Sequence, residues 1–356
     1  MYDQVLITGG AGFVGSSLAI SLKRRFPDCR ITALDNLHRR GSELALLRLN
    51  EAGVRFVHGD IRSPEDLHGL TPDLLIECSA EPSAQAGYGG SPEYLVRTNW
   101  LGCFHCLELA RTVKADFLFV STSRVYPVNA LNCLAFREDE TRFTLTPHQS
   151  IRGASENGIS EDFPLDGPRS LYGMTKLTAE LMIEEYADAY GFRYIIDRCG
   201  VIAGPWQMGK TDQGVITLWA AAHHFGRDLD YIGFGGQGKQ VRDLMHVDDF
   251  CELIADQCSS FGRYAGRRLN VGGGLASSVS LCELTSICRE VTGKRIHIGS
   301  VPANRPADVR IYLTDHTRLT DLCGWQPKRG PKQIVADIAQ WIRQEEPLVQ
   351  RVLTGG

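Results

Sequence analysis

The stretch that decides the fold is TGGAGFVG, residues 8–15, which follows the apolar run QVLIT and precedes an apolar helical pattern. Its glycines, Gly9, Gly12 and Gly15, have the spacing G-x-x-G-x-x-G. Glycine is needed where the chain turns tightly between a strand and a helix and where the backbone approaches a pyrophosphate, which then faces the helix N-terminus. The motif alone is weak, but its place between a strand and a helix predicts a dinucleotide-binding turn.

Downstream of this motif, short β-rich runs alternate with helical patterns. The runs RITALD, RFVHGD, DLLIECSA, DFLFVST and RYIIDRCGV predict strands, and helices are expected near 12–25, 43–52, 93–113 and 170–190. Apolar strands separated by helices indicate a parallel sheet that is covered on both faces. We therefore predict an α/β fold, a doubly wound parallel (Rossmann) sheet with a smaller mixed α/β substrate-binding lobe.

Two stretches interrupt this alternation. Residues 127–169 form a long polar insertion with Pro and Gly, of a kind that is usually functional or disordered inside a compact domain. Beyond about residue 203 the pattern becomes mixed. We predict an NAD-binding domain over 1–202, to which 240–275 return, and a substrate-binding lobe over 203–239 and 276–356, at the carboxyl ends of the strands.

Composition limits the class of protein. The 356 residues are 43% hydrophobic and have a formal net charge of -4, enough for a large buried core. Basic residues are scattered, so we expect no nucleic-acid partner and no membrane-surface partner. No apolar run approaches the roughly 20 residues that span a bilayer, and the first residues enter a strand pattern without a secretory leader. We expect a cytoplasmic protein.

Eleven cysteines are dispersed through apolar stretches. Cys103 and Cys106 form a C-x-x-C, but both fall on one face of an expected helix, and no second Cys or His pair at zinc spacing accompanies them. Buried reduced thiols are the better interpretation. We expect no metal site.

The second strand, RITALD, ends in Asp35, twenty residues past Gly15. A carboxylate at this place accepts hydrogen bonds from both adenosine ribose hydroxyls and repels a 2′-phosphate, so NAD is favoured over NADP. Arg39 and Arg40 keep NADP open. Asp60, at the end of the next strand, is a candidate adenine contact or a turn aspartate.

GPRSLYGMTK, residues 167–176, places Tyr172 and Lys176 four positions apart. Such a pair alone is usually part of a solvated helix face. Taken with the glycine motif, Asp35 and STSRVYP, however, it forms an ordered set that resembles the extended short-chain dehydrogenase/reductase family over nearly the whole chain. In that family a Ser or Thr at a strand end, the Tyr and the Lys surround the nicotinamide. Alignment on the V-Y of STSRVYP gives the hydroxyl role to Thr122, with Ser123 as second choice.

The chemistry accounts for each part of this set. A phenol with a pKa near 10 is a poor base at neutral pH and needs cationic help. Lys176, one turn along the helix, and the positive nicotinamide stabilise the phenolate. Thr122 positions the sugar hydroxyl, and Tyr172 removes its proton as hydride leaves the carbon for NAD. The predicted cofactor-binding residues are Gly9, Gly12, Phe13, Val14, Gly15, Asp35, Asn36, Asp60, Ile61, Ser79, Ala80, Asn99, Tyr172 and Lys176.

Several segments look more narrowly like the CDP-paratose/CDP-tyvelose 2-epimerase group of that family, among them DNLHRRGSE, AEPSAQAGY, RCGVIAGPWQMGKTDQGV, QVRDLMHVDD and RPADVRIYLTD. This resemblance implies inversion at C2 of a nucleotide-linked hexose with bound NAD, through a 2-keto sugar that is reduced on its opposite face. It implies a CDP-hexose substrate, with GDP- or UDP-hexose open, and a homodimer formed through the helices near 93–113 and 170–190.

The same group implies where the substrate binds. Arg242, and Arg305 in RPAD with Asp308, match the motifs in which relatives place two arginines on the substrate diphosphate. Bidentate guanidinium donors suit phosphate oxygens, although a surface ion pair is the alternative for either arginine alone. GPWQMGKTDQG supplies the polar candidates for the sugar or nucleotide pocket, Gln207, Lys210 and Gln213.

Three other functions are possible for a chain with this resemblance. A sugar-nucleotide 4,6-dehydratase resembles this chain, but such relatives have Asp-Glu where Ser123 and Arg124 stand, so elimination lacks its acid/base pair. A C4 epimerase needs only the same Tyr, Lys and NAD, and the motif resemblance alone separates C2 from C4. A non-catalytic NAD-sensing protein would usually have lost the Tyr or the Lys.

Overall fold

The computed structural model describes residues 2–209 and 214–354. Residue contacts divide the chain into two compact units, each assembled from three stretches of sequence. Unit 1 comprises Met1–Thr122, Leu171–Arg198 and Phe250–Arg268. Unit 2 comprises Ser123–Ser170, Cys199–Asp249 and Leu269–Gly356.

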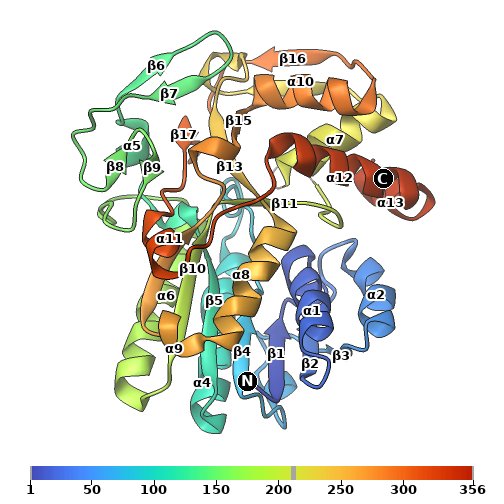
Figure 1. Cartoon of the computed structure of the whole chain (residues 1–356), viewed down its shortest axis with the longest axis vertical. Helices are drawn as coiled ribbons and strands as arrows, with labels where there is room; N and C mark the ends of the chain where they lie inside the picture. Colours follow the sequence, from blue (N-terminus) through green and yellow to red (C-terminus); the bar gives the residue numbers. More distant parts are fainter. Residues whose placement is uncertain (1, 210–213, 355–356) are drawn as a thin grey trace. The chain divides into compact units, whose positions relative to one another are not determined.

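Within the described residues, a seven-stranded sheet has the order β14-β10-β5-β4-β1-β2-β3 (Figure 1). Its strands are β1 (Gln4–Thr8), β2 (Arg30–Asp35), β3 (Arg55–His58), β4 (Leu74–Glu77), β5 (Asp116–Thr122), β10 (Tyr194–Cys199) and β14 (Arg267–Val271). The pairs β1–β2, β1–β4, β2–β3 and β4–β5 are parallel, which confirms the predicted doubly wound sheet. The chain runs outward from β1 to β3 and returns to β4 on the other side of β1. The carboxyl ends of β1 and β4 therefore flank the position where such sheets bind nucleotides.

Helices cover this sheet on both faces. They are α1 (Phe13–Arg25), α2 (Ala45–Glu51), α3 (Glu93–Val96), α4 (Gly102–Val113), α6 (Leu171–Tyr190), α8 (Val247–Ser259) and α9 (Phe261–Tyr264). Phe117 and Phe119 of β5 belong to one buried cluster with Leu107 of α4 and Ile183 of α6. Cys103 and Cys106 lie in the same cluster as free thiols, as the sequence predicts. The core of unit 1 thus holds α4 and α6 against β4 and β5.

The expected single helix over 93–113 is wrong in one respect. A π-helical turn, η3 (Arg97–Leu101), interrupts it between α3 and α4. Such a turn inserts one extra residue into a helix and is frequent at functional sites. Here it contains Asn99, whose side chain is buried and hydrogen bonded on both sides, as described below. Hydrophobic periodicity does not reveal the insertion because the apolar face resumes in α4.

The stretch 127–169 in unit 2 contains short regular elements. These are α5 (Val128–Asn132), the antiparallel pair β6 (Phe136–Glu138) and β7 (Phe143–Leu145), and the antiparallel pair β8 (Ala154–Ser155) and β9 (Gly158–Ile159). Hydrogen bonds from Ile159 to Leu313 and from Phe143 to Lys239 fix both hairpins to later parts of the same unit.

The rest of unit 2 is the predicted mixed α/β structure. Its strands are β11 (Val201–Ala203), β12 (Leu229–Ile232), β13 (Val241–His246), β15 (Ser278–Ser280), β16 (Ile298–Val301) and β17 (Ile311–Tyr312). β13 pairs in parallel with β11 and β17 and antiparallel with β15, and β12 pairs with β16. The helices are α7 (Val215–Phe225), α10 (Leu281–Thr292), α11 (Thr317–Cys323), α12 (Pro331–Gln344) and α13 (Glu346–Leu353). α10 begins with a capping box, in which Ser280 and Glu283 each bind the other's backbone amide.

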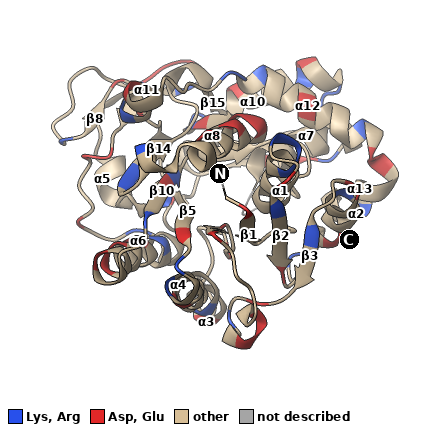
Figure 2. Ribbon diagram, turned by 60° about the horizontal axis from the view of Figure 1, so that its bottom comes forward, with Lys and Arg blue, Asp and Glu red and all other residues tan. Residues whose placement is uncertain are grey.

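Basic and acidic residues are interspersed along the described chain, as the blue and red segments of the ribbon show (Figure 2). None of the helices within residues 2–209 and 214–354 has the length and hydropathy needed to cross a bilayer.

Candidate active site

The turn after β1 has the geometry of a dinucleotide-binding loop. Gly9 has φ +62°, and a Cβ there would lie 2.9 Å from the Ser79 amide nitrogen. A Cβ on Gly15 would lie 2.2 Å from the Gly9 carbonyl oxygen, so α1 can approach the loop this closely only with glycine at both places. Gly12 caps α1 without a side-chain hydrogen bond, and Phe13 and Val14 open the helix. This close-packed loop before a free helix N-terminus fits a pyrophosphate.

Asp35 is held beside this loop by backbone amides. Its Oδ2 accepts from the Ala11 amide at 3.1 Å and its Oδ1 accepts from the Leu37 amide at 2.8 Å. Burial raises the pKa of the Asp35 carboxyl, while these amides act in the opposite direction. The carboxylate therefore lies at the end of β2 next to the glycine turn, where a ribose contact is predicted.

Asp60 is engaged within the fold. Arg62 donates to its carboxylate through Nε at 3.0 Å and Nη2 at 2.5 Å, and Asn36 Nδ2 donates at 2.9 Å. Burial pushes the pKa of Asp60 upward, but the hydrogen bonds from Arg62 and Asn36 outweigh it and leave the pKa at about 2. The next residue, Ile61, accepts a hydrogen bond from His105 Nδ1 at 2.7 Å through its carbonyl. The adenine contacts proposed for this segment stay predictions.

The π-helical turn fixes the loop that follows β4. Asn99 Oδ1 accepts from the Glu81 amide at 2.7 Å, and its Nδ2 donates to the Glu81 carbonyl at 3.1 Å and to Thr175 Oγ1 at 3.2 Å. The segment after β4, which contains Ser79 and Ala80, is therefore tied through Asn99 to α6 near Tyr172. Asn99 thus has a structural role in the predicted cofactor region.

The acid/base candidates come from the carboxyl end of β5 and the first turns of α6. Thr122 ends β5, and Tyr172 and Lys176 lie on the buried face of α6, with exposed fractions of 8%, 8% and 2%. Lys176 Nζ lies 4.0 Å from the centroid of the Phe119 ring and 3.8 Å from Glu77 Oε2. Tyr172 and Lys176 are therefore not an exposed surface pair. Ser123 opens a 3-10 turn, Ser123–Val125, which belongs to unit 2.

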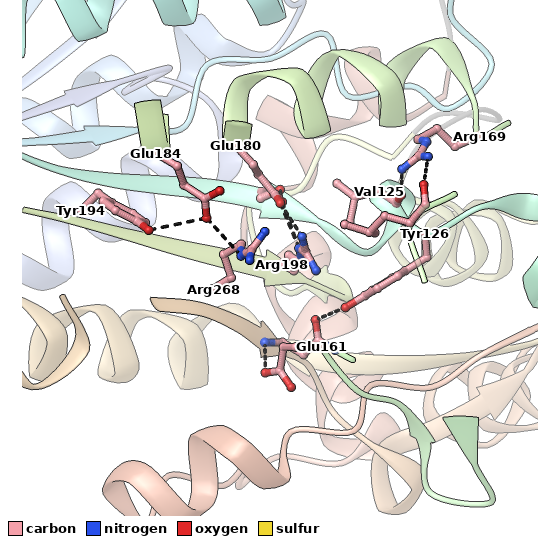
Figure 3. Close-up of polar contacts among 12 residues, drawn as sticks. Val125, Tyr126, Glu161, Arg169, Glu180, Glu184, Tyr194, Arg198 and Arg268 are labelled. Carbon is pink, nitrogen blue, oxygen red and sulfur yellow. Dashed lines mark hydrogen bonds and ion pairs between the residues drawn. The ribbon is translucent and has the colours of Figure 1, made fainter. Parts of the chain in front are cut away.

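A buried ion pair fixes α6 one turn beyond Lys176. Glu180 accepts from Arg198 of β10 through Nε at 3.0 Å and Nη2 at 2.6 Å, and it accepts from Ser121 Oγ at 2.5 Å (Figure 3). Both charged side chains are at most 1% exposed. Glu184, a further turn along, binds the partly exposed Arg268 at 3.1 Å. These contacts hold the helix of Tyr172 against the neighbouring strands.

In unit 2 the structure brings the predicted arginines together. Arg242 on β13 lies 3.5 Å from Asp308 Oδ1, and Arg305 lies 3.7 Å from Asp308 Oδ2. Burial lowers the pKa of Arg242 to about 10, together with the positive charges of Arg124 and Arg305, while Asp308 acts in the opposite direction. Arg124, which was not among the predicted site residues, donates to the Ala307 carbonyl at 3.2 Å.

This cluster, Arg124, Arg242, Arg305 and Asp308, contains three guanidinium groups and one carboxylate. An excess of positive charge at a partly buried position suits a dianionic ligand such as a diphosphate. The sequence signal for Arg124 was its place directly after Thr122–Ser123, where the dehydratases have an acidic residue.

The three polar candidates from GPWQMGKTDQG have different outcomes. Gln207 uses both ends of its amide within unit 2, because Nε2 donates to the Ile202 carbonyl and Oε1 accepts from Thr217 Oγ1, each at 3.0 Å. Its role as a substrate contact stays a prediction. Lys210 and Gln213 lie outside the described residues.

Comparison with known proteins shows which family the chain belongs to. The model of the NAD dependent epimerase/dehydratase family matches residues 5–272, three quarters of the chain. The chain belongs to this family. Family membership confirms the resemblance found in the sequence and the prediction of NAD as the cofactor. It also fits the loop in which Gly9 and Gly15 admit no side chain.

Two curated relatives and one solved structure show the range of this epimerase/dehydratase family. CDP-paratose 2-epimerase of Salmonella typhi is 28% identical over 95% of this chain and 98% of its own length. A dTDP-glucose 4,6-dehydratase of Mycobacterium tuberculosis is 30% identical over 96% of this chain and 94% of its own length. UDP-glucose 4-epimerase of Thermus thermophilus, in complex with NAD, has TM-score 0.75 and 24% identity over 96% of this chain and 99% of its own. The structure comparison supports the fold, and the family supports an enzyme that acts on sugar nucleotides with NAD.

Proposed function

We propose that this protein epimerises C2 of a nucleotide-diphosphate hexose of the CDP-paratose to CDP-tyvelose type. The observation that supports catalysis most directly is the burial of Tyr172 and Lys176 on α6 in the same unit as Thr122 and the glycine loop. The full-length similarity to a CDP-paratose 2-epimerase supports the carbon and the base. The absence of an acidic pair after Thr122 argues against dehydration.

NAD supplies the group that accepts and returns hydride. Tyr172 takes the proton of the C2 hydroxyl as that hydride leaves C2, and it gives the proton back when the 2-keto sugar is reduced on its other face. Lys176 stabilises the phenolate form of Tyr172, because an ammonium held near a phenolate favours its charged state. Thr122 donates a hydrogen bond to the reacting oxygen. We propose that unit 1 binds NAD and that unit 2 binds the sugar nucleotide.

Proton NMR with no added cofactor tests this function. Purified protein is incubated with CDP-paratose, CDP-tyvelose and GDP-mannose, and the C2 epimers are followed over time. Interconversion without external NAD supports a 2-epimerase that retains its cofactor, and relative rates rank the nucleotides. No change at C2 combined with inversion at C4 of a UDP- or dTDP-sugar would instead identify a C4 epimerase.

The arginine cluster predicts a defect in substrate binding. Arg242→Ala should raise the KM for the sugar nucleotide roughly 10- to 100-fold with little change in kcat, since a charge-assisted hydrogen bond contributes about 1.5–3 kcal/mol. Arg137→Ala is the matched control, because Arg137 is 63% exposed and its ion pair is with Asp139, two residues further along the chain. Steady-state kinetics separate the two parameters. A fall in kcat at unchanged KM would show that Arg242 does not anchor the diphosphate.

Exposed apolar side chains on two packed helices support the proposed homodimer. Six such residues lie on η3, α4 and α6, namely Trp100, Leu101, Phe104, Met174, Leu181 and Tyr190. α4 and α6 pack against each other in unit 1, so these side chains fall on neighbouring helices.

Leu181→Glu should convert a dimer to a monomer, because it places a charge on the side of α6 that carries the exposed apolar residues Met174 and Leu181. Leu47→Glu on α2, where Leu47 is 66% exposed, should leave the mass unchanged. Light scattering after gel filtration measures both masses. A wild-type monomer, or a dimer that survives Leu181→Glu, would contradict an interface on α4 and α6.

A further inference from the structure

A carboxylate lies buried beside the proposed catalytic lysine. Glu77 is the last residue of β4 and is 1% exposed, between Thr8 of β1 and Phe119 of β5 in the sheet register. Its Oε1 accepts from Thr8 Oγ1 at 3.5 Å, and its Oε2 lies 3.8 Å from Lys176 Nζ. The remaining residues of the strand, Leu74, Leu75 and Ile76, are fully buried hydrophobic residues.

Glu77 and Phe119 together hold Lys176. The ammonium lies over the Phe119 ring at 4.0 Å from its centroid, with the carboxylate on a neighbouring strand. Burying a carboxylate costs several kcal/mol unless an opposite charge and hydrogen bonds compensate it. Here the Ser79 amide and the Thr8 hydroxyl donate to Glu77, and Lys176 supplies the opposite charge. An apolar residue would pack in this strand at lower cost. This buried carboxylate therefore places a negative charge 3.8 Å from the proposed catalytic lysine.

Lys176 is the positive charge that acts on Glu77. Burial raises the pKa of Glu77 to about 7, and the positive charge of Lys176 acts in the opposite direction. Three thiols also lie close enough to sense the charge of Glu77: Cys78, the residue directly after β4, and Cys103 and Cys106 on α4. Burial raises the pKa of each of these thiols, so they stay neutral.

We propose that Glu77 is a positioning residue of the acid/base site, which holds the Lys176 ammonium and offsets its charge when ionised. The inference rests on the proposed roles of Tyr172 and Lys176. When Glu77 is protonated, Lys176 acts on Tyr172 with its full charge. When Glu77 is ionised, the two charges of the pair largely cancel, and the phenolate of Tyr172 receives less help. Activity rises with pH as Tyr172 loses its proton. Because Glu77 ionises over the same range and changes the charge that acts on Tyr172, this rise is spread over two coupled titrations, those of Glu77 and Tyr172.

Glu77→Gln should turn that rise into a single, steeper step at lower pH. The midpoint should move down by on the order of one pH unit, the effect of removing one unit charge several ångströms away at an effective dielectric constant near 20. Glu77→Asp keeps the charge and should retain a two-step rise close to that of the wild type. Glu77→Leu removes the charge in a shape that suits the apolar strand, so it gives a second charge-free variant if Glu77→Gln folds poorly.

Asp197→Asn is the matched control. Asp197 lies on β10 of the same sheet, fully buried, and burial raises its pKa to about 7 as well, while Gln257 donates to it at 3.0 Å. Its titration falls in the same pH range as that of Glu77, and the shift of its pKa comes from burial, opposed by the hydrogen bond from Gln257. The pH profile should therefore be that of the wild type.

Two readouts separate this inference from the proposed function. The first is kcat/KM for epimerisation across about pH 5.5 to 9.5. The second is the phenolate absorbance of Tyr172, obtained as the difference between each protein and its Tyr172→Phe counterpart, which needs no turnover. A lower midpoint in both charge-free variants, by either readout, supports the role of Glu77. Midpoints equal to the wild type would overturn it even if C2 epimerisation is observed. A shifted phenolate midpoint without any epimerisation would retain Glu77 and overturn the proposed function.

Discussion

Tyr172→Phe is expected to lower turnover by about 10²- to 10⁴-fold, the range that a general acid/base group contributes. The substitution removes only the phenolic oxygen, and the ring keeps its packing on the buried face of α6. NAD should remain bound, because the glycine loop and Asp35 lie at the ends of β1 and β2. Turnover is measured by the NMR assay, and retained NAD is measured after denaturation of the purified protein.

The control for this prediction lies on the same helix. Tyr186→Phe also removes one phenolic oxygen from α6, but that hydroxyl donates to Glu108 at 2.9 Å on the side of α4. Its turnover should stay within a factor of a few of the wild type. Near-normal turnover in Tyr172→Phe would exclude Tyr172 as the base, and loss of NAD together with turnover would assign it to cofactor binding instead.

Glu180→Ala should cost about 3–5 kcal/mol of the free energy of unfolding, because it leaves Arg198 buried without its opposite charge. Arg198 donates to both oxygens of Glu180, and both side chains are at most 1% exposed, so the pair is shielded from water in the folded protein. The loss should appear in urea unfolding followed by circular dichroism. Activity should fall as well, since Glu180 lies one turn beyond Lys176.

Figure 3 shows the matched control beside this pair: Glu184, one turn further along α6, binds Arg268 at the edge of the same unit. Arg268 is 41% exposed, so Glu184→Ala should cost at most about 1 kcal/mol. The double variant Glu180→Leu with Arg198→Met removes both charges and should recover most of the stability. If Glu180→Ala lowered the free energy of unfolding no more than Glu184→Ala does, water would have to reach Arg198 after the substitution.

The local parts of the candidate site could be predicted from the sequence because their chemistry depends on neighbours in the chain. The glycine turn, Asp35 and the Tyr172–Lys176 spacing each lie within one strand, turn or helix. Glu77 is different, because its relation to Lys176 exists only once β4 lies beside β5 and α6 packs on both. The available signal was an acidic residue, Glu77, inside the apolar run LLIECSA.

The π-helical turn and the arginine cluster could not be predicted from local sequence patterns, because both depend on contacts between distant parts of the chain. The extra residue at Arg97–Leu101 is stabilised by the bonds of Asn99 to Glu81 and Thr175, which come from other elements. Arg124 joins Arg242 and Arg305 through a contact with Ala307, far along the chain. Residue spacing cannot show such contacts. Arg242 and Arg305 were candidates because of the motifs in which they stand.

The strand order has a consequence for synthesis on the ribosome. β5 ends at Thr122, but its neighbour β10 begins at Tyr194, and the last strand beyond it begins at Arg267. With about 70 residues between β5 and β10 and translation at 5–20 residues per second, the edge of β5 waits roughly 4–14 s for its partner. During this interval a strand of buried apolar residues presents unpaired amides and carbonyls. The nascent chain is therefore open to misassociation through the edge of β5 until β10 has been synthesised.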